Sequence, residues 1–355
     1  MRILLATDAW EPQINGVVRT LTRTVAECRA MGHEVAVVEP SQFKTIPMPT
    51  YPEIKLAMGV YEALQEHLKA FEPEAIHIST EGPIGLAARR ICTEWKLPFT
   101  TSYHTRFPEY VSARFPAPLG VGYAYMRWFH KPSGRIMVAT HTMRAELEAR
   151  GFSNLSPWTR GVDVDQFRPD LPRVFNHLPR PVFLNVGRVA VEKNIESFLS
   201  LDLPGSKVVV GDGPQREELQ VKFPQVTFLG AKFGEDLAAC FASADVFCFP
   251  STTDTFGLVI LEAMACGTPV AAYPAPGPID IIPGSGAGVV DEDLRAACLG
   301  CLELDRERVR AYAEGFSWRA SAEEFVRNLQ PHPEPEKTRL WRRLRRMARL
   351  RRRPL

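Results

Sequence analysis

Residues 249–270, FPSTTDTFGLVILEAMACGTPV, contain the change from strand to helix that decides the fold. An apolar run opens the stretch, a short polar segment carries Asp254, and a helix is predicted to begin near Phe256 and Gly257. Glu262 follows Asp254 by eight residues, about two helical turns, so the two carboxylates can contact different parts of one elongated ligand. The alternative for Asp254 is that it only caps the helix.

The same strand-to-helix transition recurs along both halves of the chain. Short apolar runs are each followed by a glycine or polar turn and a helical stretch, which predicts parallel sheets covered by helices on both faces. The runs are RILLATD, HEVAVVEP, EAIHIST, PFTTSYH and RIMVAT in the first half, and PVFLNVG, SKVVVGDG, VTFLG, ADVFCFP, TPVAAYP and GAGVV in the second. The predicted fold class is α/β, with two Rossmann-like doubly wound domains facing each other. Ligands of such sheets bind outside the carboxyl ends of the strands.

The repeating pattern pauses over residues 161–181, which hold four prolines. At roughly 150 residues per domain, 355 residues suit two domains. The predicted organisation is a first domain over 1–165, a linker over 166–180, a second domain over 181–330 whose last helix is free to cross back to the first, and a basic tail over 331–355.

Charge is unevenly distributed along the chain. Residues 337–355 contain ten Lys and Arg and no acidic residue, so they carry a charge of +10. Residues 1–336 carry a net charge of −8, which gives +2 for the whole chain. An acidic body argues against nucleic-acid binding and favours a localised electrostatic anchor at the C-terminus. The hydrophobic fraction of 45% is typical of globular proteins, and no apolar stretch is long enough to cross a membrane. The N-terminal stretch lacks signal-peptide features, and the seven scattered cysteines indicate reduced, buried thiols of a cytoplasmic protein.

Two cations follow the first strand of the predicted second domain. In NVGRVAVEKN, Arg188 and Lys193 lie five residues apart where a helix N-terminus is expected. Two fixed cations and unpaired backbone N–H groups suit a diphosphate, although they are also compatible with an ordinary surface loop. Farther along, VVVGDGP places Gly211 after a strand, where it lets a ligand approach the backbone or only forms a tight turn. The segment is neither a Walker A loop nor a GxGxxG fingerprint.

These motifs carry a resemblance to a known family. GRxxxEK, VGDGP and TDTFGLVILEAMACGTPV, together with NGVVRTL and GVDVDQF, resemble family 4 of the retaining glycosyltransferases over nearly the whole body of the chain. The resemblance implies the GT-B fold, with a nucleotide-sugar donor in the C-terminal half and the acceptor mainly in the N-terminal half. By position, Arg188 and Lys193 resemble the clamp for the donor diphosphate, and Glu262 resembles the carboxylate that holds the ribose hydroxyls.

The resemblance implies roles for five further residues. Asp254 occupies the first acidic position of the family's E-x7-E pair, where Glu is usual, so its reach toward the donor sugar is shorter. The backbone near Phe256 and Gly257 is expected to approach the donor sugar and phosphate. Gly16, in PQINGVVRTL, matches a glycine near the transferred sugar and diphosphate. His104, after the fourth strand, matches a histidine that faces the donor sugar, although a single histidine is more often structural.

The implied reaction needs no metal. Departure of the diphosphate builds negative charge that two cations and a helix N-terminus can stabilise, so we expect no cofactor and no metal ligands. Asp163 and Asp165 form a DxD, but it lies in the linker and does not follow a strand, so a metal-binding role is rejected. The predicted function is retaining transfer of a hexosyl group from GDP-mannose or a UDP-hexose to an acceptor hydroxyl. The alternatives are a nucleotide-sugar 2-epimerase of the same fold and a non-enzymatic membrane adaptor.

The C-terminal sequence TRLWRRLRRMARLRRRPL predicts contact with an anionic membrane surface. Leu340 and Leu344 fall on one helical face and Arg342 and Arg345 on the opposite one. A solubilising disordered tail and RNA adhesion are the alternatives. Aromatic and basic residues over 106–132 form a second candidate surface, or belong to the core. Since the motif variants resemble those of enzymes that glycosylate lipids, the expected acceptor is a lipid such as diacylglycerol, or a glycan, and the expected location is the cytoplasmic, inner face of the membrane.

Overall fold

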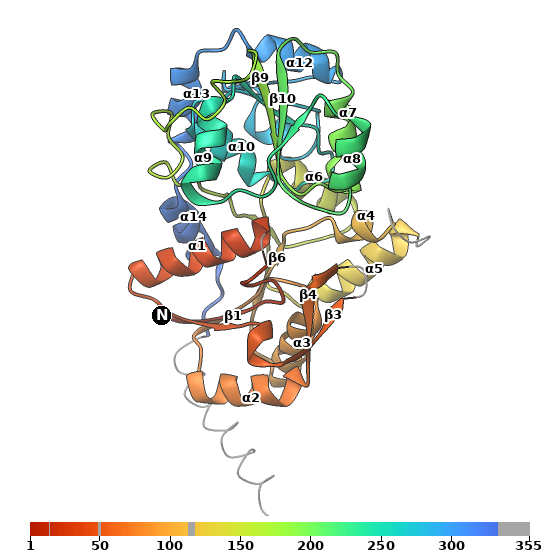
Figure 1. Ribbon diagram of the computed structural model, residues 1–355. Helices are drawn as coiled ribbons and strands as arrows, with labels where there is room; N and C mark the ends of the chain where they lie inside the picture. Colours follow the sequence, from red (N-terminus) through yellow and green to blue (C-terminus); the bar gives the residue numbers. More distant parts are fainter. Residues whose placement is uncertain (14, 49–50, 113–117, 333–355) are drawn as a thin grey trace, which may run out of the picture.

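The computed structural model describes residues 1–13, 15–48, 51–112 and 118–332. The predicted membrane-binding segment over 338–355 lies outside these residues. Figure 1 shows two lobes, each built around its own sheet. Among the helices of the described residues, none is long and apolar enough to cross a membrane.

The first lobe contains a parallel sheet whose strands are buried by helices on both faces. Its strands are β1 (Arg2–Ala6), β2 (Glu34–Val38), β5 (Ala75–Ile78), β6 (Thr100–Tyr103), β7 (Arg135–Val138) and β8 (Leu155–Pro157). They lie in the order β2-β1-β5-β6-β7-β8. Every residue of β5 and β6 is buried, as expected where crossover helices cover both sides of a parallel sheet.

Two α-helices of the first lobe begin at residues whose side chains cap them, Asn15 and Thr140. The Asn15 side chain accepts hydrogen bonds from the N–H groups of Val17 and Val18 and so starts the first helix. The helices are α1 (Gly16–Ala30), α2 (Val60–Phe71), α3 (Pro83–Trp95), α4 (Phe107–Ser112), α5 (Leu119–His130) and α6 (His141–Ala149). An antiparallel hairpin, β3 (Lys44–Met48) and β4 (Tyr51–Met58), lies outside the main sheet and was not predicted. Its prolines interrupt the alternation that marks a strand.

The second lobe repeats the design. Its strands are β9 (Val182–Val186), β10 (Ser206–Val210), β11 (Thr227–Phe228), β12 (Val246–Phe249), β13 (Val270–Ala272) and β14 (Gly288–Val290). Their order is β11-β10-β9-β12-β13-β14, that of a dinucleotide-binding sheet. The connecting helices are η2 (Val191–Lys193, a 3₁₀ turn), α7 (Ile195–Leu199), α8 (Arg216–Lys222), α9 (Gly234–Ser243), α10 (Leu258–Ala265), α11 (Pro278–Ile281), α12 (Leu294–Cys301) and α13 (Arg306–Ala313).

The predicted fold class is confirmed. Each apolar run quoted from the sequence forms one parallel strand, and the two sheets are doubly wound. Within the first lobe only the short β8 and the β3–β4 hairpin had no counterpart in the predicted strands. All seven cysteines are buried thiols.

Two segments connect the lobes. After β8 the chain packs onto the second lobe, where Phe167, Leu171 and Phe175 are buried in the core around α10. The helix α14 (Trp318–Asn328) returns to the first lobe and lies beside α1 (Figure 1). Phe325 of α14 is buried in the same apolar cluster as Ile3 of β1.

Candidate active site

The two central strands of the second sheet carry the predicted cations and Asp254 at their carboxyl ends. β9 and β12 are hydrogen-bonded neighbours, and the sheet continues from them in opposite directions, to β10 and to β13. Ligands of doubly wound sheets bind at this kind of reversal in strand order. Arg188 follows β9 by two residues, Lys193 ends η2, and Asp254 lies in the loop after β12.

An ion pair and two hydrogen bonds join the loops after β9 and β12. Lys193 Nζ lies 2.6 Å from Asp254 Oδ1, and these side chains are 24% and 19% exposed. The Thr253 hydroxyl and the Asn194 amide each donate to a backbone carbonyl of the opposite loop, at 3.0 and 3.2 Å. Gly257 precedes α10 without any side-chain cap, so Asp254 serves as an ion-pair partner and not as a helix cap.

Glu262, in the second turn of α10, joins the two lobes. Its side chain is 5% exposed, and Oε1 forms an ion pair with Arg19 of α1. Oε2 is buried and has no hydrogen-bond partner in the part of the chain that the structure describes. Burial raises the pKa of Glu262, and Arg19 opposes that shift. A buried acceptor oxygen at the interface of the lobes suits a ligand that brings hydroxyl groups.

The N-termini of α1 and α10 meet beside this carboxylate. A Cβ atom on Gly16 would lie 3.8 Å from Leu258 Cδ1, so the first turns of the two helices are in contact. Gly257 has a φ of +84°, a conformation that favours glycine and that turns the chain into α10. The Phe256 ring is buried in the core. Any contact of Phe256 with an anion therefore comes from its backbone, where helix N-termini favour negative charge.

His104 follows β6 and contacts the loop that carries Asp254. Its backbone carbonyl accepts a hydrogen bond of 2.7 Å from the Thr255 hydroxyl. Its ring lies between two partners, with Ser102 Oγ 2.8 Å from Nε2 and Arg160 Nη2 3.4 Å from Nδ1. The structure thus places His104 at the boundary between the lobes, on the same side as the Lys193–Asp254 pair.

Three residues of this interface were missed by the sequence analysis. Arg19 and Arg160 lie inside segments quoted for other reasons, NGVVRTL and TRGVDVDQF, and Thr255 lies in TDTFGLV. An arginine in a helix or a loop carries no sign of its partner in the sequence. The approach of the two lobes gives Arg19 its carboxylate, and the packing of the chain after β6 against the chain after β8 gives Arg160 its imidazole.

Gly211 is explained by the backbone of the protein itself. It has a φ of +148°, and a Cβ atom there would lie 1.8 Å from the carbonyl oxygen of Gly187. The loops after β9 and β10 therefore touch at this point, and no ligand is needed to account for the glycine. A donor-binding role for Gly211 stays a prediction.

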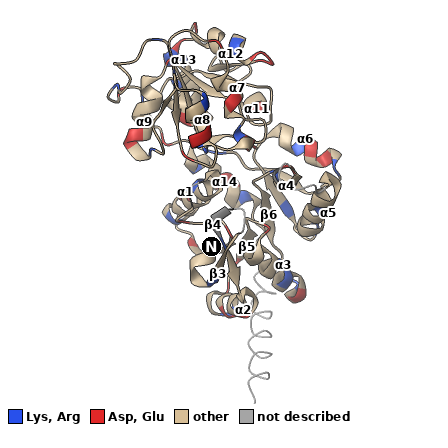
Figure 2. Cartoon of the chain, turned by 45° about the vertical axis from the view of Figure 1, so that its right-hand side comes forward, with Lys and Arg blue, Asp and Glu red and all other residues tan. Residues whose placement is uncertain are grey.

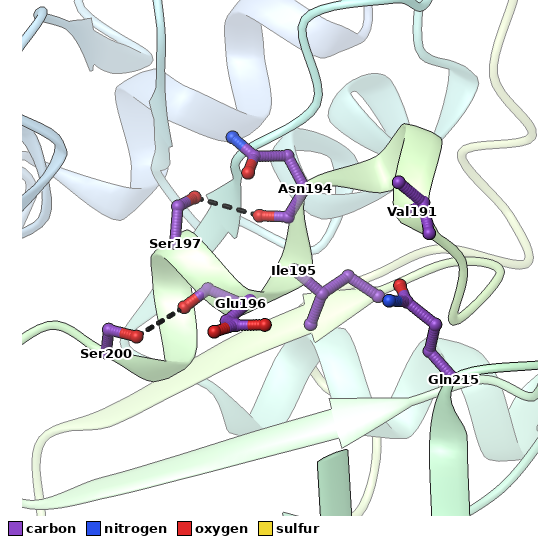
Figure 3. Close-up of a pocket in the computed structure, with 7 residues that line it drawn as sticks. All are labelled: Val191, Asn194, Ile195, Glu196, Ser197, Ser200 and Gln215. Carbon is purple, nitrogen blue, oxygen red and sulfur yellow. Dashed lines mark hydrogen bonds between the residues drawn. The ribbon is translucent and has the colours of Figure 1, made fainter. Parts of the chain in front are cut away.

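A hollow of about 400 Å³ lies next to η2 (Figure 3). Its lining consists of Val191, Asn194, Ile195, Glu196, Ser197, Ser200 and Gln215. The hydroxyls of Ser197 and Ser200 donate to the carbonyls of Asn194 and Glu196, both at 2.8 Å. Among the described residues that line the hollow none is a cation and Glu196 is an anion, so the hollow does not suit a diphosphate.

Asp163, from the DxD of the linker, has structural partners. Its Oδ2 lies 2.8 Å from Arg23 Nη2 of α1, and its Oδ1 accepts a 3.1 Å hydrogen bond from the N–H of Gln166. These contacts fasten the segment after β8 to the first lobe. Within the described ranges, no group of three or more His, Cys, Asp or Glu side chains is placed to hold a metal ion.

Comparison with known proteins yields two family matches and several relatives. Residues 14–166 match the model of "Glycosyltransferase Family 4", and residues 180–304 match that of "Glycosyl transferases group 1". A sulfoquinovosyl transferase SQD2 of Arabidopsis thaliana is 30% identical over 360 residues, covering 89% of this chain and 70% of the relative. A GDP-mannose-dependent alpha-mannosyltransferase of Mycobacterium tuberculosis is 29% identical, with coverages of 82% and 83%. An alpha-monoglucosyldiacylglycerol synthase of Streptococcus pneumoniae is 26% identical, with coverages of 85% and 78%.

Solved structures share the two-lobed architecture. The sucrose-phosphate synthase of Thermosynechococcus elongatus superposes with a TM-score of 0.74 at 19% identity, covering 92% of this chain and 97% of that one. WaaG, a glycosyltransferase of lipopolysaccharide biosynthesis, superposes with a TM-score of 0.64 at 18% identity, with coverages of 92% and 98%. At these identities the likeness shows the GT-B fold. Together with the family matches over both lobes, it establishes that the chain belongs to glycosyltransferase family 4 and is a nucleotide-sugar-dependent hexosyltransferase.

Proposed function

We propose that the protein transfers a hexosyl group from GDP-mannose or a UDP-hexose to a hydroxyl of a membrane lipid such as diacylglycerol. Transfer proceeds with retention at the anomeric carbon and without a metal. The observation that carries the proposal is the pairing of site charges at one edge of the second sheet: Lys193 with Asp254, and Glu262 with Arg19.

Glu262 is the proposed partner of the nucleotide ribose. Its Oε2 is buried without a partner in the described residues, while Oε1 already carries Arg19. A ribose hydroxyl donating to Oε2 satisfies the buried acceptor, which otherwise costs about 1–3 kcal/mol. Glu262 lies about one turn along α10 from the phosphate-facing N-terminus, so ribose and diphosphate can be held by one helix.

Arg188 and Lys193 are the proposed diphosphate clamp. Breaking the bond between the anomeric carbon and the diphosphate oxygen leaves positive charge on the sugar and negative charge on the diphosphate. Two cations and the N–H groups at the starts of α1 and α10 stabilise that negative charge, and such preorganised donors each contribute about 10²–10³ in rate. Asp254 orients Lys193 through the 2.6 Å contact and keeps a second oxygen for a sugar hydroxyl.

Retention follows when the acceptor attacks from the side on which the diphosphate departs. The acceptor hydroxyl forms the new bond to the anomeric carbon, and its proton passes to a diphosphate oxygen. No side chain then has to form a covalent sugar intermediate, unlike in retaining glycosidases.

The names of the relatives support the choice of substrates. They describe transfer of mannose from GDP-mannose, transfer of sulfoquinovose, and synthesis of a glucosylated diacylglycerol. The last of these names specifies a glycolipid product, which favours a lipid acceptor for this chain.

A partly apolar surface on the first lobe supports a membrane-bound acceptor. Within the candidate segment 106–132, α5 has a buried face and an exposed one: Tyr123 and Phe129 are in the core, whereas Val121 is 65% and Trp128 50% exposed. The Arg89 guanidinium lies 3.9 Å from the centre of the Trp128 ring, and Figure 2 shows further basic residues along α3 and α5. We propose that this face and the basic tail bind the inner, anionic leaflet.

The proposal is tested in two steps. Thermal shift of the purified chain against UDP- and GDP-sugars identifies the donor, because a bound donor stabilises the folded state. Transfer of the labelled sugar is then measured with and without anionic vesicles containing diacylglycerol, in the presence of EDTA. A glycolipid with retained anomeric configuration is expected, and epimerised nucleotide-sugar without transfer would refute the proposal.

A further inference from the structure

Arg160 is a buried guanidinium without an acidic partner in contact. It is 4% exposed, and Nη1 donates to the backbone carbonyls of Trp158 and Thr159. Its guanidinium carbon lies 4.4 Å from the centre of the Trp158 ring. In the described residues no carboxylate reaches ion-pairing distance of Arg160. Burial lowers its pKa to about 9, and the more distant Glu324 opposes that shift. A cation held in this way needs a reason, because burying an unpaired charge is costly.

Among the described residues, the hydrogen bond that Arg160 makes outside its own segment is with His104. Nη2 of Arg160 lies 3.4 Å from Nδ1 of His104. A guanidinium can only donate, so Nδ1 must be an acceptor and carry no proton. The imidazole is therefore neutral, with its hydrogen on Nε2.

The rest of the hydrogen-bond chain agrees with this assignment. His104 Nε2 lies 2.8 Å from Ser102 Oγ, which accepts its hydrogen. Ser102 also accepts from Nε2 of His77 at 3.1 Å, and the Thr100 hydroxyl at 2.9 Å supplies the hydrogen for Nδ1 of His77. The Ser102 hydroxyl itself donates to the carbonyl of Ser79. The Thr100 hydroxyl also lies 3.5 Å from the Ile76 carbonyl, and we assign its hydrogen to the nearer His77 Nδ1. With this assignment every donor in the chain has an acceptor, and both histidines are neutral.

We propose that Arg160 is the positioning residue of His104, holding its ring in the neutral Nε2–H form beside the loop that carries Asp254. The inference rests on the proposed place of His104 at the donor sugar. Its consequence is electrostatic: a protonated imidazole would repel the positive charge that develops on the departing sugar, whereas the neutral ring does not.

The groups that face His104 all lower its pKa. Burial lowers the pKa of His104 most, followed by Arg160 and then by His77 of β5 and His130 of α5. The loop after β12 contributes the uncharged Thr255. Arg160 is therefore the permanently charged group in contact with the His104 ring, and one substitution removes its charge.

The experiment compares three variants of the full-length enzyme. Arg160→Met removes the guanidinium, Arg160→Lys keeps the charge, and Arg306→Met is the control. Arg306, on α13 of the other lobe, is also partly buried and also donates to backbone carbonyls, at 2.7 and 3.2 Å. The readouts are ¹⁵N NMR of labelled histidines, assigned with His104→Ala, and the pH profile of kcat/KM for transfer.

In the wild type and in Arg306→Met, the His104 signals should show a Nδ1 that is still unprotonated at pH 6.5, the ordinary pKa of histidine. In Arg160→Met, Nδ1 should become protonated at a higher pH, and the acid limb of kcat/KM should move up by about one pH unit. Arg160→Lys should fall between them. Unchanged histidine signals and an unchanged acid limb in folded Arg160→Met would overturn the inference. A wild type without transfer activity would instead refute the proposed function, and the NMR comparison would still test Arg160.

Discussion

Lys193 Nζ lies 2.6 Å from Asp254 Oδ1, across the two central strands of the second sheet. The lysine follows β9 and the aspartate follows β12, so strand adjacency alone brings together residues 61 positions apart. Asp is one methylene shorter than the Glu usual in this family, and here the shorter side chain reaches the lysine. The pair places a cation and a carboxylate where diphosphate and sugar are proposed to meet.

Replacing Lys193 by Ala should lower kcat by about 10²–10³. The ammonium group contributes most when negative charge develops on the leaving diphosphate, so kcat should fall more than nucleotide affinity. Steady-state transfer kinetics and calorimetry with the nucleoside diphosphate measure the two effects. Lys222→Ala is the matched control, since Lys222 is an exposed lysine of the same lobe that pairs with Glu196. Turnover equal to that of the control would rule out the clamp.

Glu262→Gln should change how the stability of the protein depends on pH. Since burial raises the pKa of Glu262 above 4.5, its contribution to stability is fully present below pH 4.5 and is lost as pH rises through the folded value. The neutral Gln does not lose it. The Tm difference, variant minus wild type, should therefore grow from pH 4.5 to pH 8, measured by calorimetry.

The same substitution should weaken nucleotide binding by about tenfold or more, because a hydrogen bond to a carboxylate is worth about 1.5–3 kcal/mol. Glu323→Gln, an exposed position on α14, serves as the control for both measurements. Nucleotide affinity that stays at the wild-type value would remove Glu262 from the ribose site.

His77 should make the first lobe sensitive to acid. Burial, and secondarily Arg160, lower the pKa of His77 from 6.5 to about 3. Its stabilising contribution is present above pH 6.5 and is lost as pH falls toward 3, with a slope of up to about 1.4 kcal/mol per pH unit. Urea unfolding over this range measures how the free energy of unfolding depends on pH. For His77→Gln this dependence should be weaker than for the wild type by the uptake of one proton, even if the variant is less stable at every pH. Parallel pH dependences would contradict the assignment.

The exposed face of α5 should matter only when the acceptor is in a membrane. The double variant Val121→Ser, Trp128→Ser should reduce transfer to diacylglycerol in anionic vesicles several-fold, since it removes apolar area that enters the interface. Donor binding in solution should not change. Val221→Ser is the control, because Val221 is 84% exposed on α8 of the other lobe. Equal loss in vesicle-free assays would assign the effect to folding and not to the membrane.

The strands were predictable because parallel strands buried on both faces are continuous apolar runs. RILLATD and PVFLNVG became β1 and β9, with Thr7 and Asp8 outside the first strand and Pro181 and Gly187 outside the second. The β3–β4 hairpin was not predictable, because Pro47 interrupts one strand and Pro52 the other. Its register is set by pairing within the fold and not by a pattern along the chain.

Some residues of the candidate site could likewise be predicted from the sequence, and others could not. Arg188, Lys193, Asp254 and Glu262 could be found because they follow strands or stand at fixed intervals in one strand–loop–helix unit. Arg19 and Arg160 could not, because their partners lie in other elements, 243 and 56 residues away.

The amino-acid sequence by itself determined two doubly wound sheets and the residues that stand at their carboxyl edges, since periodicity and spacing are local properties. Tertiary structure decided which charges meet. The ion pair of Glu262 with Arg19 exists only because two lobes pack against each other, and the contact of His104 with Arg160 exists only because the chain segments after β6 and β8 meet within the first lobe. The energy of a buried charge depends on everything that surrounds it.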